Sequence, residues 1–183
     1  MVVGPATEEA TMDERELFED LLSRVHENVH QIAEGLAQED LLVVPGPGSN
    51  PIGWLLWHIS RVQDAQVAAL LQQDQVWTEP GWAERFGLDA DPRNVGYGHS
   101  TEQVAEVRPE SVVALTEYYD AVEERTSGFL RTLTPDALDR VVDRDWDPPV
   151  TLGVRLISIL DDDIQHAGQA AYVRGLLERR ADS

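Results

Sequence analysis

The chain contains no cysteine and no lysine. Without cysteine there is no disulfide, no thiolate ligand for a metal and no cysteine nucleophile, so a metal site must be built from histidines and carboxylates. A reactive thiol, where the chemistry needs one, must come from another molecule. The absence of cysteine therefore restricts the nucleophiles and metal ligands that the protein itself can supply.

Positive charge and long apolar runs are also scarce. Fourteen basic residues face 34 acidic ones, which gives a formal net charge of −20. Such a chain repels a phosphate backbone, so nucleic acid is excluded as an expected partner. No apolar run reaches the roughly 18 residues of a membrane span, and the N-terminus has no basic region followed by an apolar one. We therefore expect a cytoplasmic protein that binds no membrane.

Helical periodicity dominates the rest of the sequence. Apolar residues recur at steps of three and four and predict four long helices, over about 13–38, 51–73, 109–133 and 151–179. Ser49 or Asn50 is expected to cap the second helix, and 134–142 to form a short capped helix. No strand alternation of useful length is found. The prediction is an all-α four-helix bundle, one domain over 1–183 with its helical core at about 13–179.

The segment 76–108, between the second and third helices, is predicted to be a long ordered crossover. Its Gly, Pro and Asp residues prevent a long helix. Its aromatic residues, Trp77, Trp82, Phe86 and Tyr97, are large enough that we expect them to be buried. The crossover is therefore expected to pack against the bundle and to cover one end of it.

One short motif, HENVH at 26–30, has the HExxH spelling of a zinc peptidase. The apolar stripe of the first helix passes through Val25 and Val29, so His26 and His30 lie about 100° away, on the flank of the helix. Glu27 turns toward solvent. The metzincin extension is missing, and no second helix supplies an obvious glutamate ligand. We interpret the two histidines as partly exposed flank residues and the peptidase spelling as coincidence.

A different group of residues has the helical phase that a metal site needs. His58 shares the inward stripe of the second helix. His166 lies on the fourth helix among small residues, and Asp162 lies one turn earlier on the same face. A His from one helix facing an Asp and a His from another is how helical bundles build a three-ligand site with open coordination positions. His58, Asp162 and His166 are therefore predicted metal ligands.

Two alternatives stay open on spacing alone. Asp163, three residues before His166, could replace Asp162 as the ligand. The two histidines could instead be separate, hydrogen-bonded core residues, with the aspartates at 161–163 forming a solvated helix turn.

Two segments resemble the second and fourth helices of the DinB-like superfamily, NPIGWLLWHISRVQD at 50–64 and DDDIQHAGQAAYVRGLL at 161–177. That group includes thiol-dependent maleylpyruvate isomerases and bacillithiol or mycothiol S-transferases. Its members are four-helix bundles that hold a divalent metal with one His on helix two and two ligands one turn apart on helix four. By resemblance, His58 and His166 match the histidine positions. Asp162 stands where relatives often have His, or Glu in the isomerase type.

The resemblance implies a metal-dependent enzyme, a thiol S-transferase or isomerase. The shorter Asp ligand leaves the metal open among zinc, nickel and manganese, of which zinc is preferred. A mycothiol-like low-molecular-weight thiol would bind as thiolate and attack a small-molecule electrophile. Gln169 is expected to orient a ligand or substrate, and His99 to act as an acid/base group or lid element. The alternative is a non-catalytic metal-binding or dimeric interaction module; a homodimer is expected from the resemblance in either case.

Overall fold

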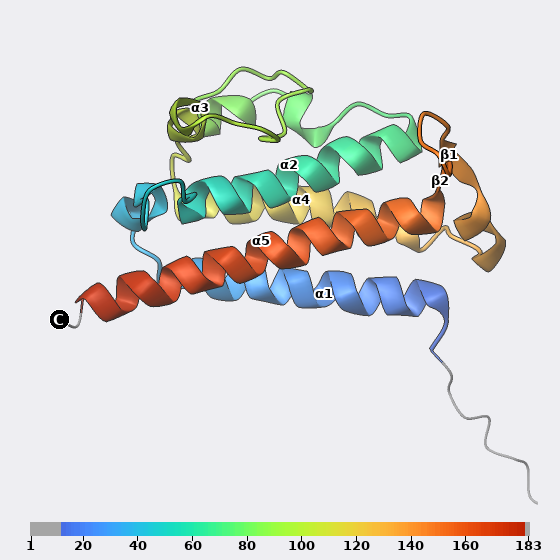
Figure 1. Cartoon of the computed structure of the whole chain (residues 1–183), viewed down its shortest axis with the longest axis horizontal. Helices are drawn as coiled ribbons and strands as arrows, with labels where there is room; N and C mark the ends of the chain where they lie inside the picture. Colours follow the sequence, from blue (N-terminus) through green and yellow to red (C-terminus); the bar gives the residue numbers. More distant parts are fainter. Residues whose placement is uncertain (1–11, 182–183) are drawn as a thin grey trace, which may run out of the picture.

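Four long helices form the body of the protein in a computed structural model that describes residues 12–181 (Figure 1). They are α1 (Glu14–Ala33), α2 (Ile52–Leu71), α4 (Val112–Leu130) and α5 (Leu152–Ala181). Both α1 and α2 pack against α4 and α5. The helices therefore stand at the corners of a square in the order α1, α4, α2, α5, and the predicted all-α four-helix bundle is confirmed.

The helices form because each buries an apolar stripe in the shared core. On α1 the buried stripe is the predicted one and includes Phe18, Leu22, Val25, Val29 and Ile32. On α2 the second half differs from the prediction, because Val62, Gln66 and Leu70 are only half-buried. Its fully buried positions include Arg61 and Asp64, which no apolar pattern could indicate.

Helix ends differ from the prediction at two places. Helix α1 begins with a capping box between Asp13 and Glu16, but it ends at Ala33, before the predicted end. Gly35 follows with a φ of 67°, and the chain then forms a 3₁₀ helix, η1 (Gln38–Leu42). Pro51 is the N-cap residue of α2 and no side chain caps that helix, so the predicted cap from Ser49 or Asn50 is wrong.

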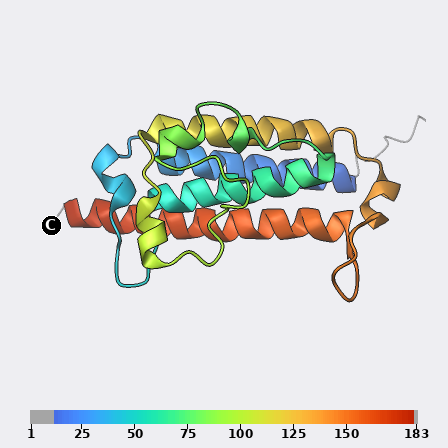
Figure 2. The same cartoon turned by 90° about the horizontal axis from the view of Figure 1, so that it is seen from above.

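The crossover lies over the outer side of α2 rather than over an end of the bundle (Figures 1 and 2). It contains two 3₁₀ helices, η2 (Val76–Thr78) and η3 (Ala83–Phe86), and a short helix α3 (Thr101–Glu106). Trp77 and Phe86 are buried as expected. Tyr97 is 93% exposed, contrary to the prediction, because the inward position of its turn is occupied by the neighbouring Gly96.

Between α4 and α5 the chain forms a small hairpin that the sequence did not indicate. The predicted short helix is a 3₁₀ helix, η4 (Pro135–Asp139), without a side-chain cap. Strand β1 (Val141–Asp143) follows and pairs antiparallel with β2 (Val150–Thr151). These strands are too short for alternation to reveal them. Within residues 12–181, no helix is long and apolar enough to cross a membrane.

Candidate metal centre

Three predicted ligands meet where α2 packs against α5. His58 Nε2 lies 3.8 Å from one carboxylate oxygen of Asp162, and His166 Nε2 lies 3.6 Å from the other. One ligand atom from each residue falls within 4.8 Å of the other two. The bundle thus brings together a nitrogen, an oxygen and a second nitrogen at the spacing that a single ion can bridge.

Hydrogen bonds from Nδ1, the ring nitrogen that points away from Asp162, fix the direction in which both imidazoles point. His58 Nδ1–H donates to the carbonyl oxygen of Val95, which can only accept. His166 Nδ1 lies 3.0 Å from Oε1 of Gln169, one turn further along α5, and donates to it. Each ring therefore directs the lone pair of its Nε2 toward Asp162, the tautomer that a metal ligand requires. The predicted orienting contact of Gln169 is present.

Burial sets the charge states of the cluster. It lowers the pKa of His58 from 6.5 to about 4, with a smaller contribution from the nearby His166, so His58 is neutral at pH 7. Burial also raises the pKa of Asp162, against the opposing effect of His166. One Asp162 oxygen is buried without a hydrogen-bond partner. A cation would satisfy this oxygen, so the donor set fits a divalent metal.

Asp163, the alternative ligand left open by the sequence, lies outside the cluster. Its side chain is fully buried, and neither carboxylate oxygen has a hydrogen-bond partner. Burial raises its pKa well above the usual value, and the neighbouring Asp162 adds to this rise. Of the three aspartates only Asp161 is exposed, so the turn at 161–163 is not solvated throughout, and the carboxylate that faces both histidines belongs to Asp162.

A layer of aromatic residues covers the cluster from the crossover side. Trp54 stacks on His58, with ring centroids 4.6 Å apart and planes 14° from parallel. Its indole N–H donates to Nδ1 of His99 at 3.2 Å, and Nε2 of His99 lies 2.9 Å from the side-chain oxygen of Asn94. His99 therefore lies behind Trp54 with both ring nitrogens hydrogen-bonded, and its role as an acid/base group or lid element stays a prediction.

Gly96 explains why the crossover can approach His58 so closely. A Cβ atom at this position would lie 2.7 Å from Nδ1 of His58 and 3.0 Å from the rings of Trp54 and Trp57. The residue also has a φ of 92°, which side chains disfavour. Glycine is thus needed both for the turn and for the contact that positions the Val95 carbonyl over His58.

A buried polar network holds the crossover against α2, and the sequence analysis missed it. Arg61 is fully buried and donates to Asp64 at 3.2 Å and to the carbonyl oxygen of Asn94 at 3.1 Å. The Asp64 carboxylate accepts from the backbone N–H groups of Val76 and Trp77 at 2.9 and 2.8 Å. The apolar pattern of α2 could not indicate it, because the crossover supplies the hydrogen-bond partners of these two polar residues.

The sequence matches the model of a known protein family along most of the chain. Residues 21–170 match the family model of the DinB superfamily, a span that contains all three cluster residues. The chain belongs to the DinB superfamily. A solved structure with the same fold, titled as the crystal structure of a conserved protein from Enterococcus faecalis, is 32% identical and has a TM-score of 0.82. The match covers 90% of this chain and 96% of that one. No curated protein matches the sequence.

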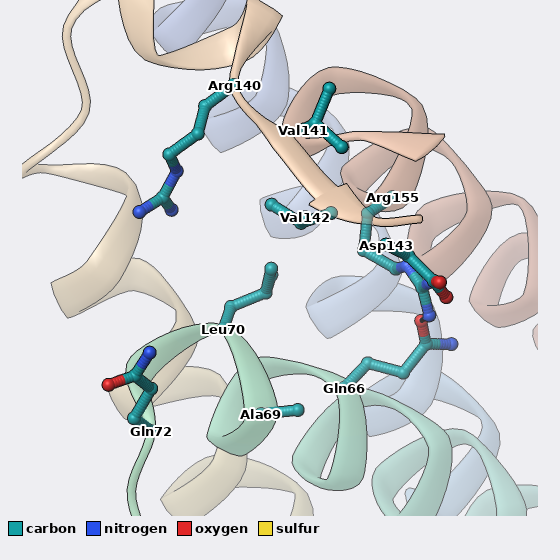
Figure 3. Close-up of a pocket in the computed structure, with 9 residues that line it drawn as sticks. All are labelled: Gln66, Ala69, Leu70, Gln72, Arg140, Val141, Val142, Asp143 and Arg155. Carbon is teal, nitrogen blue, oxygen red and sulfur yellow. Dashed lines mark hydrogen bonds and ion pairs between the residues drawn. The ribbon is translucent and has the colours of Figure 1, made fainter. Parts of the chain in front are cut away.

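A cavity opens beside the cluster in this DinB-superfamily bundle. Its volume is about 630 Å³, and its walls include His166, Gln169 and Tyr172 from α5 and residues of the loop 45–50. A second cavity, of about 340 Å³, lies toward the other end of α2, beside β1, with Leu70 of α2, Gln72 and Arg140 among its lining residues (Figure 3). None of the cluster residues lines it. Of these two cavities, only the one at His166 has a residue of the candidate metal centre in its wall.

Proposed function

We propose that this DinB-superfamily protein is a divalent-metal-dependent enzyme, a thiol S-transferase or isomerase that acts on a small electrophile. The observation that carries the proposal is the pair of oriented imidazoles, His58 and His166, facing the incompletely hydrogen-bonded carboxylate of Asp162. Three protein ligands with open positions are typical of catalytic rather than structural metal sites. The superfamily match supports the metal-binding part of the proposal.

The donor set of two nitrogens and one oxygen suits zinc, and nickel and manganese are the alternatives. A divalent cation at this position would lower the pKa of an incoming thiol and so supply the thiolate nucleophile. His58 and His166 would hold the ion with rings kept in place by their Nδ1 hydrogen bonds, and the Asp162 carboxylate would lower the positive charge of the site. Trp54 covers His58 and keeps water away from that side.

The substrates would enter through the cavity beside His166. A volume of about 630 Å³ is in the range of pockets for small organic molecules. The thiol must come from solution because the chain has no cysteine. Gln169 lines the cavity and also accepts from His166, so it links the substrate side of the site to the orientation of one ligand.

The test is turnover with a thiol panel. Zinc-loaded protein is mixed with mycothiol, bacillithiol or glutathione and a chromogenic electrophile, and product is followed by absorbance. We expect turnover with at least one thiol. Gln169→Leu should lower metal affinity or kcat/KM by about 10-fold to 100-fold, the usual effect of removing an outer-sphere partner.

Gln165→Leu is the matched control, because Gln165 lies one turn earlier on α5 and bonds only the exposed Asp161 among the described residues. It should retain wild-type rates. Absence of turnover with every thiol, in protein that holds the metal, would instead support the non-catalytic binding module.

A further inference from the structure

A second cluster of two histidines and an aspartate lies at the opposite edge of the square, where α1 packs against α4. His26 and His30 come from the HENVH segment of α1, and Asp120 comes from α4. One ligand atom from each lies within 4.8 Å of the others. The two histidines are on the flank of α1, as the helical phase predicted, but the flank faces a carboxylate from another helix.

The contacts within this cluster converge on one oxygen. Asp120 Oδ1 lies 2.7 Å from Nε2 of His30 and 3.7 Å from Nδ1 of His26. The two imidazole rings are adjacent, with centroids 4.4 Å apart. Ligand atoms around a tetrahedral zinc ion, at bond lengths of about 2.0–2.2 Å, are about 3.3–3.6 Å apart. The two separations from the Asp120 oxygen lie on either side of this range, and all three ligand atoms lie within 4.8 Å of one another.

A second observation is a ring nitrogen of His26 that lacks a hydrogen-bond partner. His26 Nδ1 is buried and has no hydrogen-bond partner, although the imidazole as a whole is 39% exposed. This nitrogen is the one that faces Asp120. A buried imidazole nitrogen without a partner is costly, and in a polar cluster it suggests an ion or ligand that completes the contacts.

We propose that His26, His30 and Asp120 bind a divalent transition-metal ion, independently of the His58 cluster. Two imidazoles favour zinc, copper or nickel over magnesium or calcium, which prefer oxygen ligands. The His30 and Asp120 side chains are 39% and 45% exposed, so an ion can enter from solvent and keep water in its remaining positions. Glu27 is exposed and takes no part, so the site lacks the general base of a HExxH peptidase.

Metal binding here would join α1 to α4 and displace the proton from Nε2 of His30. The short contact between His30 and Asp120 is a hydrogen bond through Nε2 of His30. An ion needs the lone pair of that nitrogen, so the proton must leave or move to Nδ1. An ion that binds only where the two helices are packed together also raises the melting temperature.

The test isolates this cluster in a His58→Ala background, with Asp162→Asn as a second background where the first fails to fold. Zinc or nickel chloride is titrated, and bound metal and histidine ¹⁵N chemical shifts are measured. We expect one bound equivalent, a shift of the His30 proton away from Nε2 and a higher melting temperature. Adding His30→Gln or Asp120→Asn should abolish all three effects, while Glu27→Gln should leave them unchanged.

Two results would overturn the proposal. One is the absence of bound metal in the folded His58→Ala protein at millimolar zinc and nickel. The other is metal binding that survives His30→Gln and Asp120→Asn, because the ion would then be held by other residues. Circular dichroism of each variant shows whether a loss of binding reflects unfolding.

Discussion

Untagged His58→Ala protein is expected to lose the tightly held metal that the wild-type protein retains through gel filtration. His58 is the only member of its cluster on α2. Its removal leaves Asp162 and His166, two ligands one turn apart on a single helix, which hold an ion more weakly than three ligands do. Protein metal content, measured by elemental analysis, should fall from about one retained equivalent to the background level.

His30→Ala is the matched control for this loss. It removes one histidine from the cluster on α1 and α4, whose more exposed side chains would let a bound ion exchange with solvent. The metal retained through gel filtration should therefore stay at the wild-type level. Full metal retention in His58→Ala, or loss of the metal in His30→Ala alone, would show that the tightly bound metal does not lie at the His58 cluster.

Asp64→Asn is expected to lower the free energy of unfolding by about 3–5 kcal/mol, the usual result of removing one partner from a buried ion pair. Asp64 is fully buried and accepts hydrogen bonds from Arg61 and Tyr118 as well as from two backbone N–H groups. An asparagine amide would present N–H to some of these donors and leave the Arg61 charge unpaired. Urea unfolding followed by circular dichroism measures the change.

Asp20→Asn makes the same chemical change at an exposed ion pair with Arg24 on α1 and should shift the unfolding midpoint very little. Asp64→Asn should also weaken metal binding, because Arg61 bonds the carbonyl oxygen of Asn94 and the next carbonyl, of Val95, orients His58. Equal stability of the two variants would show that the buried network does not hold the crossover in place.

Helical periodicity was enough to predict the bundle and to bring one cluster together. His58 was selected because it shares the inward stripe of α2, and Asp162 because it lies one turn from His166 on α5; both are properties of a single helix. Packing in the bundle then places them face to face. The choice between Asp162 and Asp163 needed the structure, since adjacent residues differ by only about 100° around a helix.

Features that depend on contacts between distant segments could not be predicted. The Arg61 and Asp64 positions are polar yet buried, because the crossover supplies their hydrogen-bond partners. Gly96 is needed because His58 lies against it, and the sequence around it does not show this. The HENVH histidines were placed correctly on the flank of α1, but Asp120 belongs to another helix and its approach is a result of packing.

The central claim is that His58, Asp162 and His166 hold a metal that receives a thiol. Its most direct test is the visible and near-ultraviolet spectrum of the cobalt(II) protein during titration with mycothiol or a similar thiol. Wild-type protein, which has no cysteine, should develop a sulfur-to-cobalt charge-transfer band that is absent from His58→Ala. A wild-type spectrum that does not change with thiol, or an equal band in His58→Ala, would contradict the account.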